Sequence, residues 1–241
     1  MNTDTRPRHA APARRRYLRG VLGIVGELMI TAGVVLGLFV AWQLLWTDVV
    51  GDGEQAETVS QLEDAFRVPT DHDDAPATRK PAEFGDAFAI LRIPRFGPAY
   101  AKPVLEGTDR LTLQKGIGHY PESVMPGEIG NFAVAGHRTT YGKPFNKVAE
   151  LKAGDLIIVE TRESYFVYEV YEDLIVAPTQ TEVVAPVPGR RLGEQPTEAL
   201  MTMTSCHPMF SSRQRWVTHS RLIQTIPHDQ GLPPELLEVS G

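Results

Sequence analysis

The sequence contains a single cysteine, Cys206, at the end of the apolar segment 199–206. A thiolate is a strong nucleophile, and an adjacent imidazole can activate it and carry protons. His137 follows the apolar segment 131–136, and Arg215 opens the segment 215–226. A guanidinium is always protonated, so it can donate to an oxyanion but cannot act as a base. Cys206, His137 and Arg215 therefore suffice for acyl-transfer chemistry through a thioester if the fold brings them together.

Each of these three residues also has a simpler interpretation. A free cysteine is often a small buried hydrophobe, and an odd cysteine outside the cell can instead form an intermolecular disulfide. His137 can be a structural histidine at a strand end, and Arg215 a solvated charge. Arg213 lies two residues earlier with the same strand parity. Position alone does not separate the two arginines.

The N-terminal region predicts a membrane anchor. Residues 28–46 are apolar except for Thr31 and Gln43, and two tryptophans stand at the far end. A bilayer core needs about 20 apolar residues of helix, and amphipathic rings prefer the headgroup level. Six arginines within residues 1–19 place the N-terminus in the cytoplasm and the remainder outside the plasma membrane. A cleaved signal peptide is the alternative, but the run exceeds the usual apolar region of roughly 7–15 residues.

Composition divides the rest of the chain. The net charge is −6 although the N-terminus is basic, so the body is acidic, which argues against nucleic acid as a partner. Residues 59, 62 and 66 recur at helical spacing and predict a short helix, whereas the following stretch has the composition of a disordered spacer. The predicted parts are a cytoplasmic tail (1–19), a transmembrane helix (20–46), an extracellular linker (47–83), a catalytic domain (84–228) and a C-terminal tail (229–241).

From residue 84 onward the chain has the texture of a β protein. Short apolar runs separated by Gly, Pro, Asp and Asn lie at 86–94, 131–137, 155–161, 164–176, 199–206 and 215–226. Many short strands without long intervening helices predict a mostly β fold, an antiparallel barrel that is closed or nearly closed. Short helices are expected at 111–118 and 144–151, and a long loop at 183–200.

Three motifs make the chain resemble the sortase family, and within it the class E group of high-GC Gram-positive bacteria. The stretch 202–206, TMTSC, resembles the sortase strand T-L-x-T-C, with Met for Leu and Ser for the second Thr. The stretch 116–138, GIGHYPESVMPGEIGNFAVAGHR, resembles the family block that ends in A-G-H-R, with His137 at the catalytic histidine. In Cys-x-Pro variants the family arginine falls nine residues after the cysteine, which selects Arg215. The likeness covers about residues 84–228.

The resemblance implies a closed eight-stranded sortase-type β-barrel with short helices. It implies that Cys206 attacks the bond between Thr and Gly in the C-terminal sorting signal of a secreted protein. The acceptor would be an amine of lipid II or of a peptidoglycan stem peptide. His137 would serve as acid and base, and Arg215 would stabilise the oxyanion. No cofactor and no metal are expected, and the remaining partner is the lipid bilayer.

Further residues are implied on the substrate side. Class E sortases favour Leu-Ala-x-Thr-Gly over Leu-Pro-x-Thr-Gly and carry Tyr in the G-H-x-P block, where this chain has Tyr120. Our hypothesis is that Tyr120 narrows the pocket for the residue after Leu, although it can also be a core aromatic. Thr204, Ser205 and Arg138 are expected to line the peptide groove. His119 is expected to face the same cleft without a catalytic role.

Two other functions stay open from the sequence. A class C sortase, which polymerises pilins, usually carries a lid with Asp-Pro and an aromatic residue; the linker has Asp74 to Pro76 but no aromatic after them. A catalytically dead, membrane-tethered binding module is the alternative from a different class. Papain-like peptidases are less compatible, because they place Cys before His in the chain.

Overall fold

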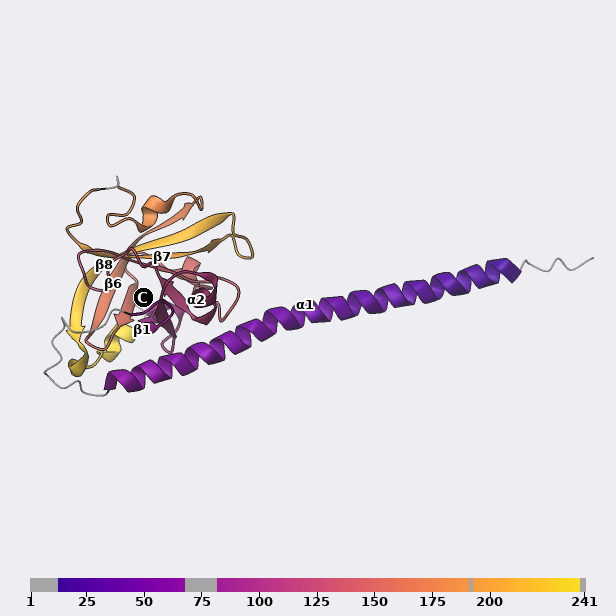
Figure 1. The fold of residues 1–241 in the computed structure, drawn as a ribbon, viewed down its shortest axis with the longest axis horizontal. Helices are drawn as coiled ribbons and strands as arrows, with labels where there is room; N and C mark the ends of the chain where they lie inside the picture. Colours follow the sequence, from indigo (N-terminus) through magenta and orange to yellow (C-terminus); the bar gives the residue numbers. More distant parts are fainter. Residues whose placement is uncertain (1–12, 68–81, 191–192, 239–241) are drawn as a thin grey trace, which may run out of the picture. The chain divides into compact units, whose positions relative to one another are not determined.

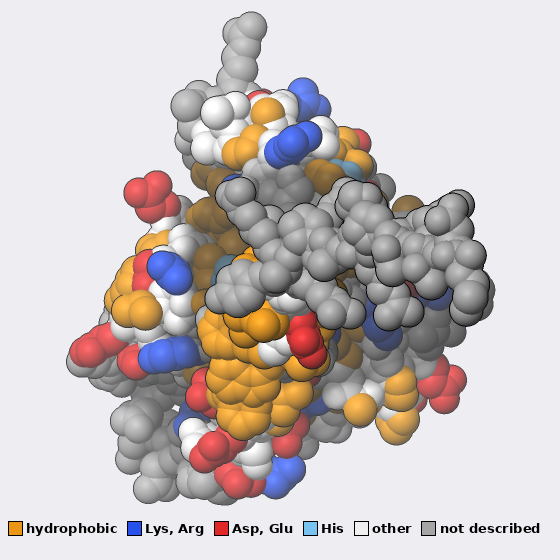
Figure 2. All heavy atoms as spheres, turned by 90° about the vertical axis from the view of Figure 1, so that its right-hand side faces the viewer, with side chains coloured by type: hydrophobic (Ala, Val, Ile, Leu, Met, Phe, Trp, Pro, Cys, Tyr) orange, Lys and Arg blue, Asp and Glu red, His pale blue; other side chains and the backbone are white. Residues whose placement is uncertain are grey.

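The computed structural model describes residues 13–67, 82–190 and 193–238 (Figure 1). The chain divides into two compact units, the first ending at Trp46 and the second beginning at Thr47. In the first unit the chain is helical, as part of α1 (Ala13–Arg67). Gly20–Trp42 is long and apolar enough to cross a membrane, and hydrophobic side chains cover its surface (Figure 2). This agrees with the predicted anchor, whose orientation stays a prediction.

The second unit is built on a closed barrel of eight strands. They are β1 (Ala87–Arg92), β2 (Ala101–Glu106), β3 (Ile117–His119), β4 (Gly130–Ala135), β5 (Leu156–Glu160), β6 (Ser164–Val176), β7 (Ala199–His207) and β8 (Gln214–Pro227). The order around the barrel is β1-β2-β3-β4-β7-β8-β6-β5, and the long strands β6 and β8 run side by side (Figure 1). The predicted closed barrel is confirmed. The expectation that it is antiparallel throughout is wrong, because β2 with β3 and β4 with β7 pair in parallel.

Short helices and turns connect the strands. Asp109 caps α2 (Arg110–Lys115) by accepting from the backbone N–H groups of Leu111 and Thr112. This confirms the first part of the helix expected at 111–118, but the helix ends at Lys115 and residues 117–118 lie in β3. Only the 3-10 turn η3 (Val148–Glu150) forms in 144–151. The remaining 3-10 turns are η2 (Pro94–Phe96), η4 (Thr181–Val184), η5 (His228–Gln230) and η6 (Pro234–Leu237).

Strands β2 and β3 were not expected from the sequence. Pro103 lies inside β2, and proline has no N–H for a ladder, so its presence argues against a strand. In the barrel, Pro103 pairs with Ile90 of β1, while the ladder with β3 begins only at Val104. The three residues of β3 are too few to give an alternating pattern.

The barrel interior determines which face of each strand carries the site. Fully buried side chains from every strand except β8 fill it, among them Ala89, Leu91, Val104, Ile117, Phe132, Val134, Ile157, Val159, Tyr168, Met201 and Met203; β8 adds the partly buried Trp216 and Leu222. Successive side chains of a strand point to opposite faces. Because Met201 and Met203 of β7 point inward, Thr202, Thr204 and Cys206 lie on the outer face.

Residues 47–67, expected to begin a linker, are helical and pack within the second unit. Val59 and Phe66 form a cluster with the fully buried Ile90 of β1. Arg92 joins the helix to the barrel, with Glu63 at 2.6 Å and Glu160 at 2.7 Å. The apolar spacing that predicted a short helix therefore marks a buried face. The predicted spacer and its Asp74–Pro76 stretch lie outside the described residues.

Candidate active site

Cys206 lies on the outer face of β7, one residue before the strand ends. The thiol is free and the residue is partly exposed, so it is neither sealed in the core nor part of a disulfide. The outer position follows from strand alternation: the inward positions of β7 are occupied by the two fully buried methionines. The side chain is thus presented where a solvent-borne substrate can reach it.

Arg215 lies directly opposite Cys206 in the antiparallel ladder between β7 and β8. Directly opposite residues share a face, with Cβ atoms about 4.5–5.5 Å apart. Arg213 precedes the first residue of β8 and has no place in this ladder, so the register separates the two arginines. Nη1 of Arg215 donates to the backbone oxygens of Ser212 (2.9 Å) and Gln214 (3.0 Å). A guanidinium has five N–H donors, so further donors remain for a ligand.

His137 follows β4, the other neighbour of β7. Ala135 pairs with Thr204, and Gly136 extends the pairing because its N–H donates to the Thr204 oxygen at 3.1 Å. Ser205 Oγ donates to the Gly136 oxygen at 2.9 Å. The next residue, His137, therefore leaves the strand beside Cys206. Continuing the β4–β7 register by two residues brings His137 to the level of Cys206, which itself pairs with Arg215 of β8.

The surroundings of the His137 ring favour its neutral form. Burial lowers the pKa of His137, because the charged imidazolium loses hydration. Nε2 is buried and has no hydrogen-bond partner among the described residues. The ring packs on Tyr141, with centroids 5.2 Å apart. A neutral imidazole with an unengaged nitrogen can accept a proton from a group brought next to it.

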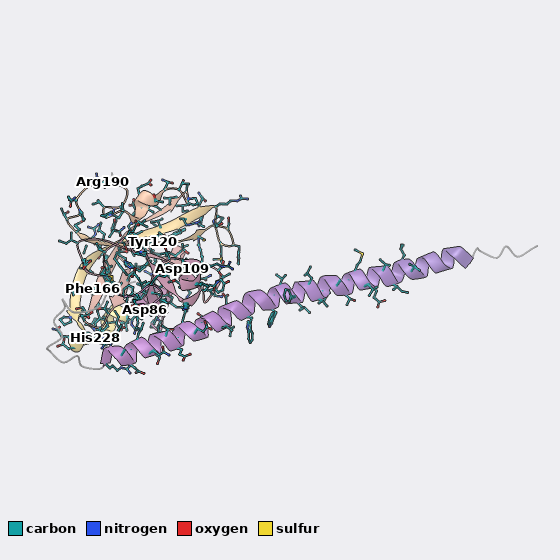
Figure 3. The ribbon with its side chains drawn as sticks, in the orientation of Figure 1. Asp86, Asp109, Tyr120, Phe166, Arg190 and His228 are labelled. Carbon is teal, nitrogen blue, oxygen red and sulfur yellow. The ribbon has the colours of Figure 1, made fainter. Side chains whose placement is uncertain are left out.

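A groove lined in part by Tyr120 reaches β7 at Thr204, two residues before Cys206 on the same face; Cys206, His137 and Arg215 are not among its lining residues. Tyr120 donates to or accepts from Thr204 across 3.1 Å between the two hydroxyl oxygens, and Figure 3 labels it on the barrel. The segment after β3 forms one wall and the β6–β7 connection the other, enclosing about 570 Å³. The lining comprises Thr108, Tyr120, Pro121, Glu122, Ser123, Thr181, Glu182, Val184, Ala185 and Pro186. Its lining combines hydroxyl and carboxylate groups with apolar side chains.

Within the described residues, no group of three or more His, Cys, Asp or Glu side chains is placed to hold a metal ion.

The sequence matches the family described as Sortase domain over residues 91–223. The chain belongs to the sortase family. It is 35% identical over 223 residues to sortase SrtE1 of Streptomyces coelicolor, covering 88% of this chain and 60% of the relative. It is 32% identical to sortase SrtE2 of the same organism, covering 92% of this chain and 90% of the relative. These relatives confirm the resemblance to class E.

A solved structure agrees with this sortase in fold. The structure of sortase E1 from Streptomyces coelicolor with tripeptide in the active site has 34% sequence identity and a TM-score of 0.57. The match covers 62% of this chain and 95% of that chain.

The structure moves three of the expected groove residues of this sortase to other places. His119 is 2% exposed, with Nδ1 at 2.8 Å from Glu106 and Nε2 at 2.8 Å from Ser123, so it does not face the cleft. Ser205 is buried on the inner face and binds the strand end before His137. Its hydroxyl therefore supports the site rather than lining the groove.

Arg138 is also buried, on the side of β7 away from the Cys206 side chain. Its Nη1 donates to the Cys206 carbonyl (3.2 Å) and to His207 Nδ1 (2.9 Å), and the guanidinium lies over the Trp216 ring at 5.4 Å. Burial lowers the pKa of Arg138, while the neighbouring Cys206 opposes this. Arg138 therefore holds the end of β7 and does not line the peptide groove.

Sequence reasoning missed two contributors to the site. One is the second groove wall at 181–186, predicted only as irregular chain; its length and Pro content were the available signal, since long ordered loops tend to be functional. The other is Tyr141, whose ring covers His137. Nothing in the sequence beyond its position near His137 indicates that contact.

Proposed function

We propose that this protein is a membrane-anchored cysteine transpeptidase that joins secreted proteins to the cell wall. The observation that supports this most is the alignment of His137, Cys206 and Arg215 at one level of the strand order β4-β7-β8. The sorting signal would lie in the adjacent groove and be cleaved between Thr and Gly. A peptide in the active site of the related sortase E1 supports this class of substrate.

The first half-reaction forms the thioacyl enzyme. The Cys206 thiolate attacks the Thr carbonyl carbon, and the developing oxyanion accepts hydrogen bonds from Arg215. The bond between Thr carbon and Gly nitrogen then breaks, and protonated His137 donates its proton to the leaving amine. This leaves a thioester on Cys206 and a neutral imidazole. Because burial lowers the pKa of His137, the protonated form that starts the cycle is a minority at neutral pH.

The second half-reaction releases the product to an amine. The acceptor nitrogen attacks the thioester carbon, neutral His137 takes the proton from the nucleophile, and Arg215 again holds the oxyanion. The carbon–sulfur bond breaks and the Cys206 thiolate is regenerated beside the imidazolium. The depressed pKa of His137 suits this step, since the neutral ring is the form that accepts a proton. The acceptor we propose is an amine of lipid II or of a peptidoglycan stem peptide.

A transpeptidation assay tests the proposal. Leu-Ala-x-Thr-Gly and Leu-Pro-x-Thr-Gly peptides are offered with several amines, including short peptidoglycan stem peptides, and Cys206→Ala serves as the blank. Mass spectrometry should find an acyl adduct on Cys206 in the wild type. Turnover in the blank, or an intact protein that never forms the adduct, would favour a binding module instead.

Tyr120 is the residue we propose for signal selection. Its hydroxyl contacts Thr204, which neighbours Cys206 on the same face of β7, so the ring closes the groove close to the nucleophile. Tyr120→Leu should reduce the preference for Ala over Pro after Leu, measured as the ratio of the two kcat/KM values. Tyr120→Phe is the matched variant: it keeps the ring and removes only the hydroxyl. An unchanged ratio in Tyr120→Leu would contradict this role.

The proposed location is the plasma membrane, with a cytoplasmic N-terminus and the catalytic domain outside. The apolar segment Gly20–Trp42 supports a single pass. Protease added to intact cells should digest an epitope at the C-terminus and spare one at the N-terminus. The reverse pattern would contradict the orientation.

A further inference from the structure

The loop that follows His137 is tied to the site at both ends. Residues 138–146, called the 138–146 loop below, close when the Phe145 N–H donates to the His137 oxygen at 3.0 Å. Asn146 Nδ2 donates to the Arg138 oxygen at 3.0 Å. At the tip, Tyr141 adopts a left-handed backbone (φ 52°) and places its ring against the His137 ring. The position of Tyr141 therefore affects how much of the imidazole is covered.

The tip of this loop is held by the start of the helical segment of the second unit. Gln55 Nε2 donates to the Tyr141 oxygen at 2.8 Å, and Gln55 is fully buried. Lys143 Nζ lies 2.9 Å from Asp48 Oδ2. Asp48 and Gln55, about two helical turns apart, therefore bind the two residues that flank Gly142. The contact to the Tyr141 oxygen satisfies the amide nitrogen of the buried Gln55, whereas its Oε1 has no partner among the described residues, so losing this contact would leave the whole amide unpaired.

Gly51 lies between these two contacts, at the closest approach of helix and loop. A Cβ at Gly51 would lie 2.8 Å from both Gly142 N and the Tyr141 carbonyl carbon, whereas a Cβ at Gly53 would meet nothing within 4 Å. Glycine in a helix interior is less stable than alanine, because it loses more backbone entropy on folding. The close packing of Gly51 against the loop backbone explains why this position of the helix has a glycine.

We infer that three residues of α1, Asp48, Gly51 and Gln55, are a positioning element of the active site: they fix the 138–146 loop so that Tyr141 covers and orients the His137 ring. The inference rests on the proposed role of His137. These three residues act through the loop, and their side chains do not touch the substrate. Loosening this element should slow the chemistry more than it weakens peptide binding.

A pair of glycine variants in the full chain, held in detergent micelles, tests this inference. Gly51→Ala must push the loop away, while Gly53→Ala makes the same chemical change on the same helix in open space. Gln55→Ala is a second route, and Asp52→Asn is its control because Asp52 pairs with Lys102 of β2 rather than with the loop. Gly51→Ala and Gln55→Ala should lower kcat about three- to tenfold with KM changed less than about twofold. Both controls should keep the wild-type kcat.

The pH dependence provides a readout that a general loss of stability does not move. Burial lowers the pKa of His137, so uncovering the ring should raise that pKa toward its usual value of about 6.5. The lone cysteine allows a measurement without substrate: the rate of iodoacetamide alkylation of Cys206 against pH. The part of the pH profile that is lost in His137→Ala reports the titration of His137. Its midpoint should move to higher pH in Gly51→Ala and Gln55→Ala and should stay at the wild-type pH in both controls.

The outcomes are separable. Equal kcat and equal alkylation profiles in Gly51→Ala, Gln55→Ala and their controls would overturn the inference. If Gly51→Ala and Gln55→Ala shift the alkylation profile as expected but the wild type never turns over peptide, the result would count against the proposed function. The positioning element would still be supported. Melting temperatures of all four variants identify any that fails to fold, and the remaining loop variant then decides.

Discussion

His219 gives a sharp prediction about pH and stability. It lies on β8 opposite Thr202, is 2% exposed, and its Nδ1 is 2.9 Å from the Thr202 hydroxyl. Burial lowers the pKa of His219 from 6.5 to about 4. Well above pH 6.5 the ring is neutral in both the folded and the unfolded state, so its titration does not change the free energy of unfolding. As the pH falls below 6.5 the unfolded state binds a proton that the folded state does not, so stability decreases until about pH 4.

The size of this effect follows from the two pKa values. Between pH 7.5 and pH 5.0, a shift from 6.5 to about 4 removes about 2 kcal/mol from the free energy of unfolding. His219→Gln can keep a hydrogen bond to Thr202 without titrating. We therefore expect the wild type to lose about 2 kcal/mol more than His219→Gln over this pH interval. Guanidinium unfolding of the full chain in detergent micelles, followed by near-UV circular dichroism at both pH values, measures the difference.

A second variant separates burial from hydrogen bonding. Thr202→Val removes the hydroxyl beside His219 but leaves the ring buried, and burial is the cause of the shift. This variant should be less stable at both pH values by about 1 kcal/mol and should keep the pH dependence of the wild type. If His219→Gln retained the full pH dependence, the reasoning from burial would be refuted.

Three further predictions concern the site itself. Arg215→Ala should reduce kcat/KM about 100- to 1,000-fold through loss of an oxyanion donor, whereas Arg213→Ala, outside the β7–β8 ladder, should change it less than about twofold; similar losses in both would contradict the register argument. Ser205→Ala removes the hydrogen bond to Gly136 and should cost about 1 kcal/mol of stability together with a fall in kcat, measured by unfolding and transpeptidation; an unaltered kcat would show that the tie does not position His137. Arg138→Met should lower the free energy of unfolding by about 1–3 kcal/mol while leaving KM for the peptide near the wild-type value, since the guanidinium faces away from the groove; a large rise in KM would restore Arg138 to the groove.

The sequence predicts the parts of the fold whose pattern is local. Segments such as 164–176 and 199–206 alternate or carry continuous apolar side chains, and they became β6 and β7. Strand β2 was not predicted, because Pro103 has no N–H to donate in a ladder. The structure shows that Pro103 pairs only with β1, since the ladder between β2 and β3 begins at the next residue, Val104. Parallel pairing of β4 with β7 is likewise a property of topology, which no local pattern encodes.

The same distinction holds for the site. The residue types of Cys206, His137 and Arg215 indicated the chemistry, and the motif spacing ranked Arg215 above Arg213. Orientation could not be obtained in this way. Whether His119 and Arg138 point into the groove or into the interior depends on the side of the strand and on partners distant in the sequence, such as Glu106 and His207.

The β7–β8 hairpin consists of two paired strands, whose register the active site requires, and a connecting turn that tolerates more sequence change. Cys206 and Arg215 are cross-strand partners, so the ladder holds both of them. Residues 208–211 of the turn can therefore change in length or composition while Ser212 keeps its contact with the guanidinium. A slip of the pairing by a single residue would have the opposite effect, because it would bring Gln214 or Trp216 opposite the thiol and turn the guanidinium to the other face. Turn grafting is therefore a permissive route to new acceptor or signal specificity on this scaffold, whereas insertions within either strand should abolish turnover.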